Sequence, residues 1–357
     1  MHKIEPKLFV NGLLQHTPRW TTESTEFDDI ILSTRIRLAR NIKSYPFPPN
    51  ASNEELRLVA SNLEKAGAKI HQIEEAGFLG FDQLSKTDAH VLVERRLISP
   101  GHAEAKHPRF AVIDKAEYIS IMVNEEDHLR LQSIQPGLAL QEAWRVISRL
   151  DDEISENIDY AFSTCYGYLT SCPTNTGTGM RASIQVHLPA LTILEKVDRI
   201  IKELAPNEIA VRGFYGEGSE IMGNIYQISN QLTLGRTEKA IVSRLEVVAH
   251  KFIEFERKAR EELYESEYVL LEDKVFRSFA ILQNARIMNS QEFLTHLSMV
   301  RLGVDMELIT NIDGAMLNEL AIVTQPAHME KMHSGLTNAE QRDVFRAQII
   351  RSRFSQE

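Results

Sequence analysis

The amino-acid sequence predicts an α+β domain followed by an all-helical one. Up to about Gly235, runs in which apolar and polar residues alternate are interspersed with runs of helical spacing. From Thr237 onward the helical pattern dominates and almost no strand signal remains. We therefore expect two domains, residues 1–260 and 261–357, divided inside a long helix near residues 255–268.

The first expected strand is DDIILSTRIRLARNI, residues 28–42. A helix is expected at 53–73, because Ser52 and Asn53 are good capping residues and apolar side chains then recur at helical spacing. HVLVERRLI (90–98) and AEYISIMVN (116–124) indicate two more strands. Residues 138–158 predict an amphipathic helix.

The second half of this domain repeats the alternation with new elements. ASIQVHL (182–188) predicts a strand and residues 190–204 a helix. Further strands are expected at 208–214 and 224–234, and a long helix over 237–263. Beyond it, helical runs are expected near 272–288, 290–301 and 315–323.

The chain has 357 residues and a net charge of −10. A wholly acidic surface repels phosphate at long range, which argues against direct nucleic-acid binding and makes any phosphate chemistry depend on a local arginine cluster. The two cysteines, Cys165 and Cys172, fit neither a disulfide framework nor a zinc site. No signal-peptide pattern and no apolar run near the roughly 20 residues of a membrane span occur, so we expect a cytoplasmic protein with reduced thiols.

TSCPTNTGTGMRASIQVH, residues 170–187, contains two glycines close together. Gly177, Gly179 and Ala182 satisfy the dinucleotide pattern G-x-G-x-x-A, but that motif precedes a helix, whereas here a strand is expected to follow. The stretch therefore predicts a turn-rich loop. Cys172 has no local base, so it is either a small apolar residue or a thiol that acts electrostatically or by hydrogen bonding beside arginines.

Five arginines are expected at strand ends or on one strand face. Arg35 and Arg37 are two residues apart and so point the same way. Arg181 opens a strand after the glycine loop, Arg212 closes one, and Arg130 follows NEEDH at the end of another. One such arginine alone is usually a surface ion pair, but five in an acidic chain predict a pocket for phosphate oxygens, which guanidinium groups bind bidentately.

Two carboxylate clusters, NEEDH (124–128) and GEGSE (216–220), allow two interpretations. They are solvated turns, or they are carboxylates that hold and deprotonate a cationic nucleophile, with Gly216 and Gly218 in a mobile closing loop. His128 with the adjacent glutamates matches no zinc motif, and no Walker loop or protein-kinase motif occurs. We expect a Mg²⁺ ion, if used, to be held mainly by nucleotide phosphates and water.

Four long motifs in this order, LSTRIRLAR, NEEDHLR, GYLTSCPTNTGTGMRAS and VRGFYGEGSE, resemble the guanidino (phosphagen) kinases. The resemblance implies a glutamine-synthetase-like catalytic domain with an antiparallel sheet and flanking helices. Only 32 residues precede Ser33, so the helical N-terminal domain of the free arginine and creatine kinases is not expected. The chain is similar to the bacterial protein arginine kinases in this short N-terminal part, in the helical tail, and in the motifs GNIYQISNQLTLG, RLGVD and TQP.

Carried over position by position, the resemblance implies that Glu126 and Glu217 face the guanidinium, with Cys172 as a substrate-side thiol. It is looser at HVLVERRLISP, where His90 and Arg96 are exchanged in type relative to the family. The residues expected to contact ATP or frame its site are Ser33, Thr34, Arg35, Ile36, Arg37, Arg96, Arg130, Arg181, Ala182, Ser183, Ile184, Gln185, Arg212, Gly213, Phe214, Tyr215 and Gly216.

The chemistry that follows is direct phosphoryl transfer. A guanidinium, with a pKa above about 12, becomes nucleophilic only as it loses a proton, so the carboxylates orient it and accept that proton. Arginines and Mg²⁺ align ATP and neutralise its charge. The alternatives are a kinase of free arginine or another small guanidino compound, a catalytically silent adaptor, and, more distantly, a glutamine-synthetase-like ligase.

The tail carries a motif of its own. Thr337 to Glu340 forms a T-x-x-E capping box, after which Arg342, Asp343 and Arg346 form R-D-x-x-R-A, with the arginines one turn apart. From the residues alone this is a solvated charged face. The resemblance implies instead an allosteric phosphoarginine site, and it also implies a homodimer through the tail, an activator protein, Clp-type protease machinery and a heat-shock repressor as a substrate.

Overall fold

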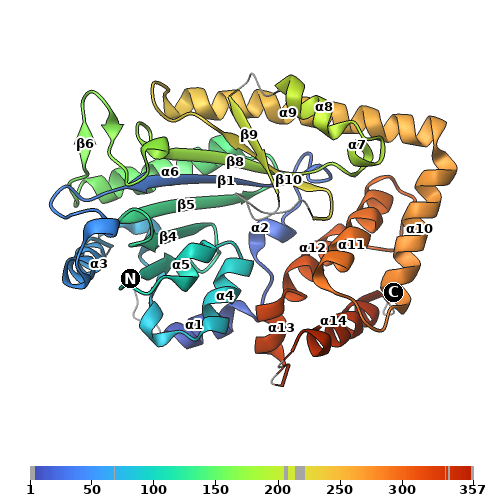
Figure 1. The fold of residues 1–357 in the computed structure, drawn as a ribbon, viewed down its shortest axis with the longest axis horizontal. Helices are drawn as coiled ribbons and strands as arrows, with labels where there is room; N and C mark the ends of the chain where they lie inside the picture. Colours follow the sequence, from blue (N-terminus) through green and yellow to red (C-terminus); the bar gives the residue numbers. More distant parts are fainter. Residues whose placement is uncertain are drawn as a thin grey trace.

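The structure is a computed structural model that describes residues 5–67, 69–204, 208–213, 222–333, 335–336 and 338–354. Within these residues, eight antiparallel strands form one sheet in the order β2-β3-β4-β5-β1-β8-β10-β9 (Figure 1). A small hairpin, β6–β7, stands apart from it. The strands are β1 Ile31–Arg40, β2 Gly77–Gly80, β3 Phe110–Ile113, β4 Ile119–Val123, β5 Leu129–Pro136, β6 Phe162–Ser163, β7 Gly167–Tyr168, β8 Met180–His187, β9 Ile209–Arg212 and β10 Ile225–Asn230.

One face of this sheet is apolar and packs against two helices, α6 (Leu140–Ser155) and α9 (Glu238–Ser266). Strand alternation sends Ile36 and Ile184 to this face, where they join one core with Ile147 of α6. The other face therefore carries the polar half of β1 and β8. The antiparallel sheet and helical layers confirm the predicted α+β class.

The expected helix at 53–73 begins as predicted and is α3, Asn53–Gly67. The hydroxyl of Ser52 accepts a hydrogen bond from the N–H of Glu55, and the Glu55 carboxylate accepts one from the N–H of Ser52. The expected helix at 190–204 is divided into α7 (Pro189–Ile193) and α8 (Val197–Leu204). Glu195 between them has a φ of +56°, which ends the first helix.

The predicted strand at 90–98 is wrong. The chain there forms α4, Lys86–Glu94, and a capping box between Ser85 and Asp88 starts it. Val91 and Leu92 are fully buried on its inner side, so the run of apolar residues marks a buried helix face rather than a strand. The other short helices in this half are α1 Pro6–Leu13, α2 Arg19–Thr22 and α5 Pro100–Glu104.

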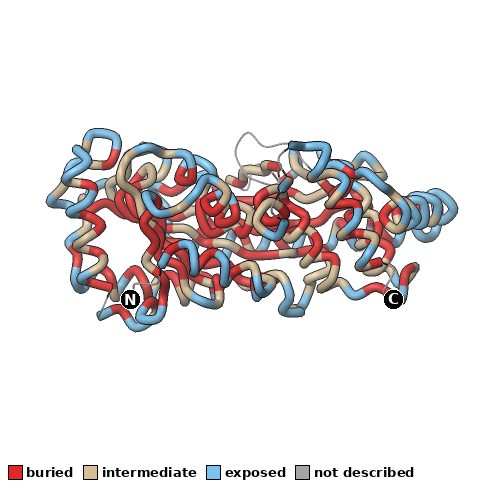
Figure 2. Tube along the Cα trace, turned by 90° about the horizontal axis from the view of Figure 1, so that it is seen from below, coloured by how far each residue is buried: buried red, intermediate tan, exposed pale blue. Residues whose placement is uncertain are grey.

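The C-terminal helical region, residues 268–354, lies at the far end of α9 (Figure 1). Buried segments run through both halves of the molecule (Figure 2). The helices of the C-terminal helical region are α10 Tyr268–Asn284, α11 Ser290–Asp305, α12 Gly314–Val323, α13 Pro326–Met332 and α14 Ala339–Phe354. α12 packs on α2 and α13 packs on α4, so the region is joined to the sheet half by more than α9.

Polar contacts fasten this junction. The Glu94 carboxylate, at the end of α4, accepts hydrogen bonds from the N–H groups of Ala327 and His328 at 2.7 and 2.9 Å. Arg260 of α9 donates to Asp29 at 2.9 Å and lies 3.6 Å from Asp305. These groups are largely buried, so parting the two halves leaves charges without partners. Within the described residues, no helix has the length and apolar character that a membrane crossing requires.

Candidate active site

Five arginines converge on one basin on the polar face of the sheet. It is lined by Arg35 and Arg37 of β1, Arg130 of β5, Arg181 of β8 and Arg212 of β9. The register explains the convergence, because Arg37 pairs directly with Arg181 across β1 and β8. The sequence suggested that Arg130 lies at the end of a strand, but it lies at the beginning of β5. Glu126 and Cys172 line the same basin. We call it the arginine basin.

The cationic groups of the basin repel one another. Burial, reinforced by the charges of Arg181 and Arg130, lowers the pKa of Arg35 to about 10. Burial and then Arg35 lower the pKa of Arg37 as well, and its Nε is buried with no hydrogen-bond partner within the described residues. A group of positive charges held this close is stabilised by an anion that accepts their hydrogen bonds.

Arg40, three residues beyond Arg37 on β1, has the opposite electrostatic environment. It is buried, it donates to both carboxylate oxygens of Asp151 at 2.7–3.1 Å, and its guanidinium lies 3.5 Å from the centre of the Tyr168 ring. Burial lowers the pKa of Arg40, but Asp151 outweighs that effect and raises it. The charge of Arg40 is thus balanced by Asp151, whereas within the described residues no carboxylate forms an ion pair with Arg35 or Arg37.

The NEEDH turn is a buried support for the basin rather than a solvated loop. Asn124, Asp127 and His128 are fully buried. The Asp127 carboxylate accepts from the Asn41 amide at 2.6 Å and from the N–H of Ser171 at 2.7 Å, which ties this turn to the loop that carries Cys172. The turn and that loop are therefore positioned as one unit.

The two glutamates of the turn hold Arg130. Its guanidinium is 2.7 Å from both the Glu125 and the Glu126 carboxylates. Burial works against the charged form of Glu125, but Arg130, the N–H of Glu126 and the Ser99 hydroxyl outweigh it and lower the pKa of Glu125. The Glu126 side chain is 40% exposed, so of the two it is the one that can reach an incoming molecule.

The loop with Cys172 is fixed by glycines and by Thr233. Gly179 has a φ of +64°, and a Cβ there would lie 2.6 Å from the carbonyl oxygen of Ala39, so only glycine fits. The Thr233 hydroxyl donates to the carbonyls of Thr174 and Thr176 at 2.9 and 2.7 Å. The Cys172 sulfur lies 3.0 Å from the Thr174 hydroxyl and remains partly accessible.

The other predicted nucleotide residues divide between the two faces of the sheet. Ser33, Ser183 and Gln185 lie on the face that carries the basin, since they alternate with the core residues. Four others have side chains on the opposite face of the sheet, so only their backbone atoms can border the basin: Thr34, Ile36, Ala182 and Ile184. Arg96, whose φ is +62°, donates to the Gln185 amide oxygen beyond the basin.

Part of the predicted site lies outside the described residues. Arg212 and Gly213 are described, but Phe214, Tyr215, Gly216 and the second predicted carboxylate, Glu217, are not. Several residues that line the basin were not predicted from the sequence, and Gln227 is the one among them that contacts a basin arginine through its side chain in the described residues. Gln227 of β10 lines the basin, and its amide oxygen accepts from Arg35 at 3.1 Å. The alternating pattern of IYQISN was the signal that could have revealed it.

No group of three or more His, Cys, Asp or Glu side chains stands ready to hold a metal within the part of the chain described. A Mg²⁺ ion that stays bound to nucleotide phosphates and water needs no such cage, because Mg²⁺ retains several waters and takes few protein carboxylates. The donor set of the basin, guanidinium groups with one accessible carboxylate, fits the phosphates rather than the metal.

The model of the ATP:guanido phosphotransferase C-terminal catalytic domain matches residues 58–259. A crystal structure of lombricine kinase has the same fold, with a TM-score of 0.57 and 24% identity, covering 66% of this chain and 68% of that one. The chain therefore belongs to the ATP:guanido phosphotransferases, enzymes that move a phosphoryl group between ATP and a guanidino group.

Within that class the chain is similar to the protein-arginine kinases. The model of the McsB C-terminal domain of protein-arginine kinase matches residues 269–357. The protein-arginine kinase of Halothermothrix orenii is 43% identical over 349 residues, which cover 98% of this chain and 99% of the relative. That of Geobacillus sp. (strain WCH70) is 47% identical over 340 residues, 95% and 94% of the two chains.

Proposed function

We propose that this chain transfers the γ-phosphoryl group of ATP to arginine side chains of other proteins. The family supports the reaction, and the observation that carries the assignment of residues is the arginine basin with Glu126 and Cys172 at its edge. The phosphates lie among Arg35, Arg37, Arg130, Arg181 and Arg212. The target guanidinium enters beside Glu126 and Cys172.

In this reaction the bond between the γ-phosphorus and its bridging oxygen breaks, and a bond from phosphorus to a guanidino nitrogen forms. ADP leaves with the bridging oxygen, and a guanidinium proton passes to a carboxylate. Glu126 holds the guanidinium and, together with Glu217, is the proposed acceptor of that proton. Mg²⁺ bound to the phosphates supplies further charge neutralisation.

Cys172 lies where it can shape the guanidinium side without forming a covalent bond. Its sulfur is next to the Thr174 hydroxyl at 3.0 Å, and no histidine lines the basin to serve as its base within the described residues. We assign to it contact with the target guanidinium. Comparing the pH profiles of Cys172→Ala and Cys172→Ser separates a charged thiolate from a purely steric role.

The test of the reaction is an incubation with labelled ATP, an arginine-containing protein and free arginine. Acid-labile label on the protein is the expected result. Label confined to free arginine would instead mean a small-molecule kinase, and no acid-labile label would mean an adaptor. Glu126→Gln should abolish transfer, whereas Glu74→Gln, on an exposed turn, serves as the matched control and should retain it.

We further assign phosphoarginine binding to Arg342, Asp343 and Arg346 in the C-terminal helical region, with activation of the kinase as the consequence. Arg342 is paired with Glu330 at 3.0 Å and is the more accessible of the two arginines. Thr337, the expected capping residue, lies outside the described residues, and the Asn338 amide oxygen accepts from the N–H of Gln341 at the start of α14. Arg342→Ala should remove phosphopeptide binding and the activation, whereas Arg353→Ala on the same helix should not.

The assembly and cellular role are proposals that rest on family resemblance. The domains are residues 1–260 and 261–357, and the second forms a homodimer. Exposed Tyr264, Val269 and Phe276 near the α9–α10 turn offer an apolar surface for it. Val269→Asp should then give a monomer in sedimentation velocity.

Proteins that carry phosphoarginine, among them a heat-shock repressor, pass to Clp-type protease machinery as part of the stress response and protein quality control. An activator protein assists the kinase. The location is the cytoplasm, which keeps free thiols such as Cys165 and Cys172 reduced.

A further inference from the structure

An apolar surface lies outside the arginine basin, on the β6–β7 hairpin and the segment that follows β10 (Figure 1). Phe162 and Tyr166 of the hairpin and Leu234 after β10 line one open hollow. These residues are 56%, 60% and 55% exposed. We call the three of them the hairpin platform. Large apolar side chains that gather in one exposed hollow mark a binding surface.

Backbone contacts hold the platform in place. The N–H of Tyr168 donates to the Gly177 carbonyl at 2.8 Å, and the N–H of Thr178 donates to the Thr233 carbonyl at 3.3 Å. Gly177 has a φ of +114°, and a Cβ there would lie 2.6 Å from the carbonyl oxygen of Thr233, so only glycine lets these segments meet. The Phe162 ring meets the Tyr168 ring edge-on, with their centres 5.2 Å apart. The apolar side chains are therefore presented by a fixed backbone.

The platform is continuous with the guanidinium side of the arginine basin. Thr233, the neighbour of Leu234, donates to the carbonyls of Thr174 and Thr176 in the loop that follows Cys172. Cys172 and Thr174 themselves line the basin. Only two residues and one hydrogen bond lie between Cys172 and Thr233, so about five extended residues of a polypeptide span the distance from Cys172 to the platform.

The charge at the rim of the hollow suits a basic partner. Glu238 lines the hollow, and its carboxylate forms no ion pair within the described residues. Arg236 lines it as well, but this guanidinium is already paired with Glu208. The charge left for a partner is therefore negative, which favours a polypeptide segment that carries arginine.

We propose that the hairpin platform binds the segment of a protein substrate next to its target arginine. The occupant is an extended polypeptide with an apolar side chain within about five residues of that arginine. The proposal rests on the proposed function, in which the target guanidinium enters beside Cys172. It makes Phe162, Tyr166 and Leu234 determinants of specificity for arginine in a protein, because a free guanidino compound that fills the basin does not reach them.

Two synthetic peptides test the platform. Each contains one arginine, flanked three residues before and after by phenylalanine in the first peptide and by serine in the second. The wild type should phosphorylate the phenylalanine peptide with a KM about tenfold lower than that of the serine peptide. The double variant Tyr166→Ser with Leu234→Ser should raise the first KM to the level of the second, with kcat and the KM for ATP unchanged.

Two controls accompany this variant. Tyr166→Phe with Leu234→Met keeps the platform apolar and should retain the preference. Leu8→Ser removes a side chain that is 62% exposed on α1, away from the hairpin in Figure 1, and should behave as wild type. A thermal unfolding scan verifies that each variant is folded.

The outcomes separate this proposal from the kinase assignment. If the wild type phosphorylates both peptides with equal KM, or if the double serine variant keeps the preference, the proposal is overturned while the kinase assignment stands. If that variant keeps the preference and changes from dimer to monomer in sedimentation velocity, the platform is an interface between copies of this chain instead. If neither peptide nor a denatured protein is phosphorylated, the kinase assignment fails and this proposal fails with it.

Discussion

The arginine basin and the Arg342–Arg346 pair both place guanidinium groups side by side, yet they are held in opposite ways. In the basin, Arg35 and Arg37 face other cations and their pKa values are lowered. On α14, Arg346 is 1% exposed and donates to the carbonyls of Thr324 and Met288 and to Asp343 at 2.5–3.0 Å. Arg35 and Arg37 are therefore prepared for an anion, whereas an anion at α14 has to compete with the partners that Arg346 already has.

The largest expected effect concerns the basin. Arg181→Ala should lower kcat/KM by about 1,000-fold, because a preorganised donor to the transferring phosphoryl group is lost. The free energy of unfolding should stay the same or rise, since repulsion with Arg35 and Arg37 is relieved. Steady-state kinetics and urea unfolding measure the two quantities. A variant that is both active and destabilised would make Arg181 a structural residue.

On α14 the balance should be reversed. Arg346→Ala should lower the free energy of unfolding by about 3 kcal/mol, because it leaves the buried carbonyls and Asp343 without their donor. Urea unfolding followed by circular dichroism measures it. Arg346→Lys should recover only part of the loss, since an ammonium group cannot reach all three acceptors in the same geometry. An unchanged midpoint for Arg346→Ala would show that the pair is not a structural fastening.

Acidification should weaken the support behind the basin. His102, faced by Glu125, Arg109 and His107, has its pKa lowered by burial to about 4. An unfolded histidine titrates near 6.5, so between about pH 6.5 and 4 the unfolded chain binds the extra proton and stability falls as the pH falls. The contribution of this group to the loss is roughly 3 kcal/mol. Urea unfolding across this range should show a shallower slope for His102→Asn than for the wild type.

The smallest expected effect belongs to Arg342. Its pair with Glu330 joins side chains that are 25% and 32% exposed, so Arg342→Ala should cost about 0.5 kcal/mol of stability. Differential scanning calorimetry measures the change. A loss as large as that for Arg346→Ala would remove the distinction between the two arginines and make both of them structural.

Local patterns predicted much of this site because strand alternation is a property of the strand itself. Arg35 and Arg37 on one face of β1 and Arg181 after the glycine loop follow from it directly. The register that sets Arg37 opposite Arg181 does not, since those residues are 144 positions apart and only tertiary folding joins them. Alternation places Gln227 on one face of β10, but only the pairing of β10 with β8 and β9 brings that face to the basin.

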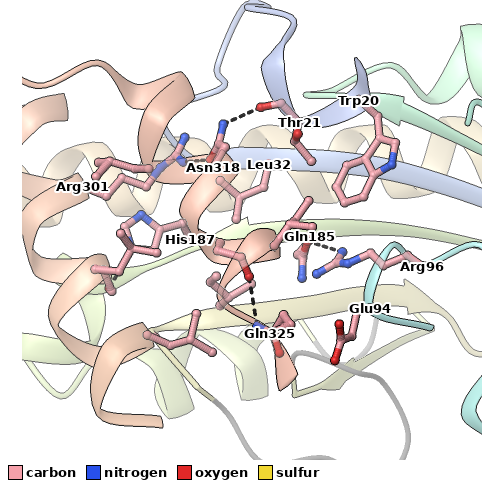
Figure 3. A pocket seen from close by; sticks show the side chains of 18 residues that line it. Trp20, Thr21, Leu32, Glu94, Arg96, Gln185, His187, Arg301, Asn318 and Gln325 are labelled. Atoms are coloured by element: carbon pink, nitrogen blue, oxygen red, sulfur yellow. Dashed lines mark hydrogen bonds between the residues drawn. The ribbon is translucent and has the colours of Figure 1, made fainter. Parts of the chain in front are cut away.

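Burial was harder to predict than secondary structure. In α4 the apolar residues are buried by neighbouring elements, which made a helix look like a strand. The sequence left open whether NEEDH is a solvated turn or a functional one, because its residues are polar, but Asn124, Asp127 and His128 each have partners far along the chain. The cavity between Trp20 of α2 and Leu317 of α12 is lined by both halves of the molecule (Figure 3) and has no local signature at all.

The position of Arg260 matters for the choice of boundaries in truncated variants of this chain. The catalytic family match ends at residue 259, one residue before the arginine that joins Asp29 to Asp305. A chain shortened there loses the last turns of α9 and with them Leu263, which is fully buried. The catalytic half expressed by itself would carry an open apolar seam and an unpaired Asp29, so its solubility and activity would not represent those of the intact enzyme.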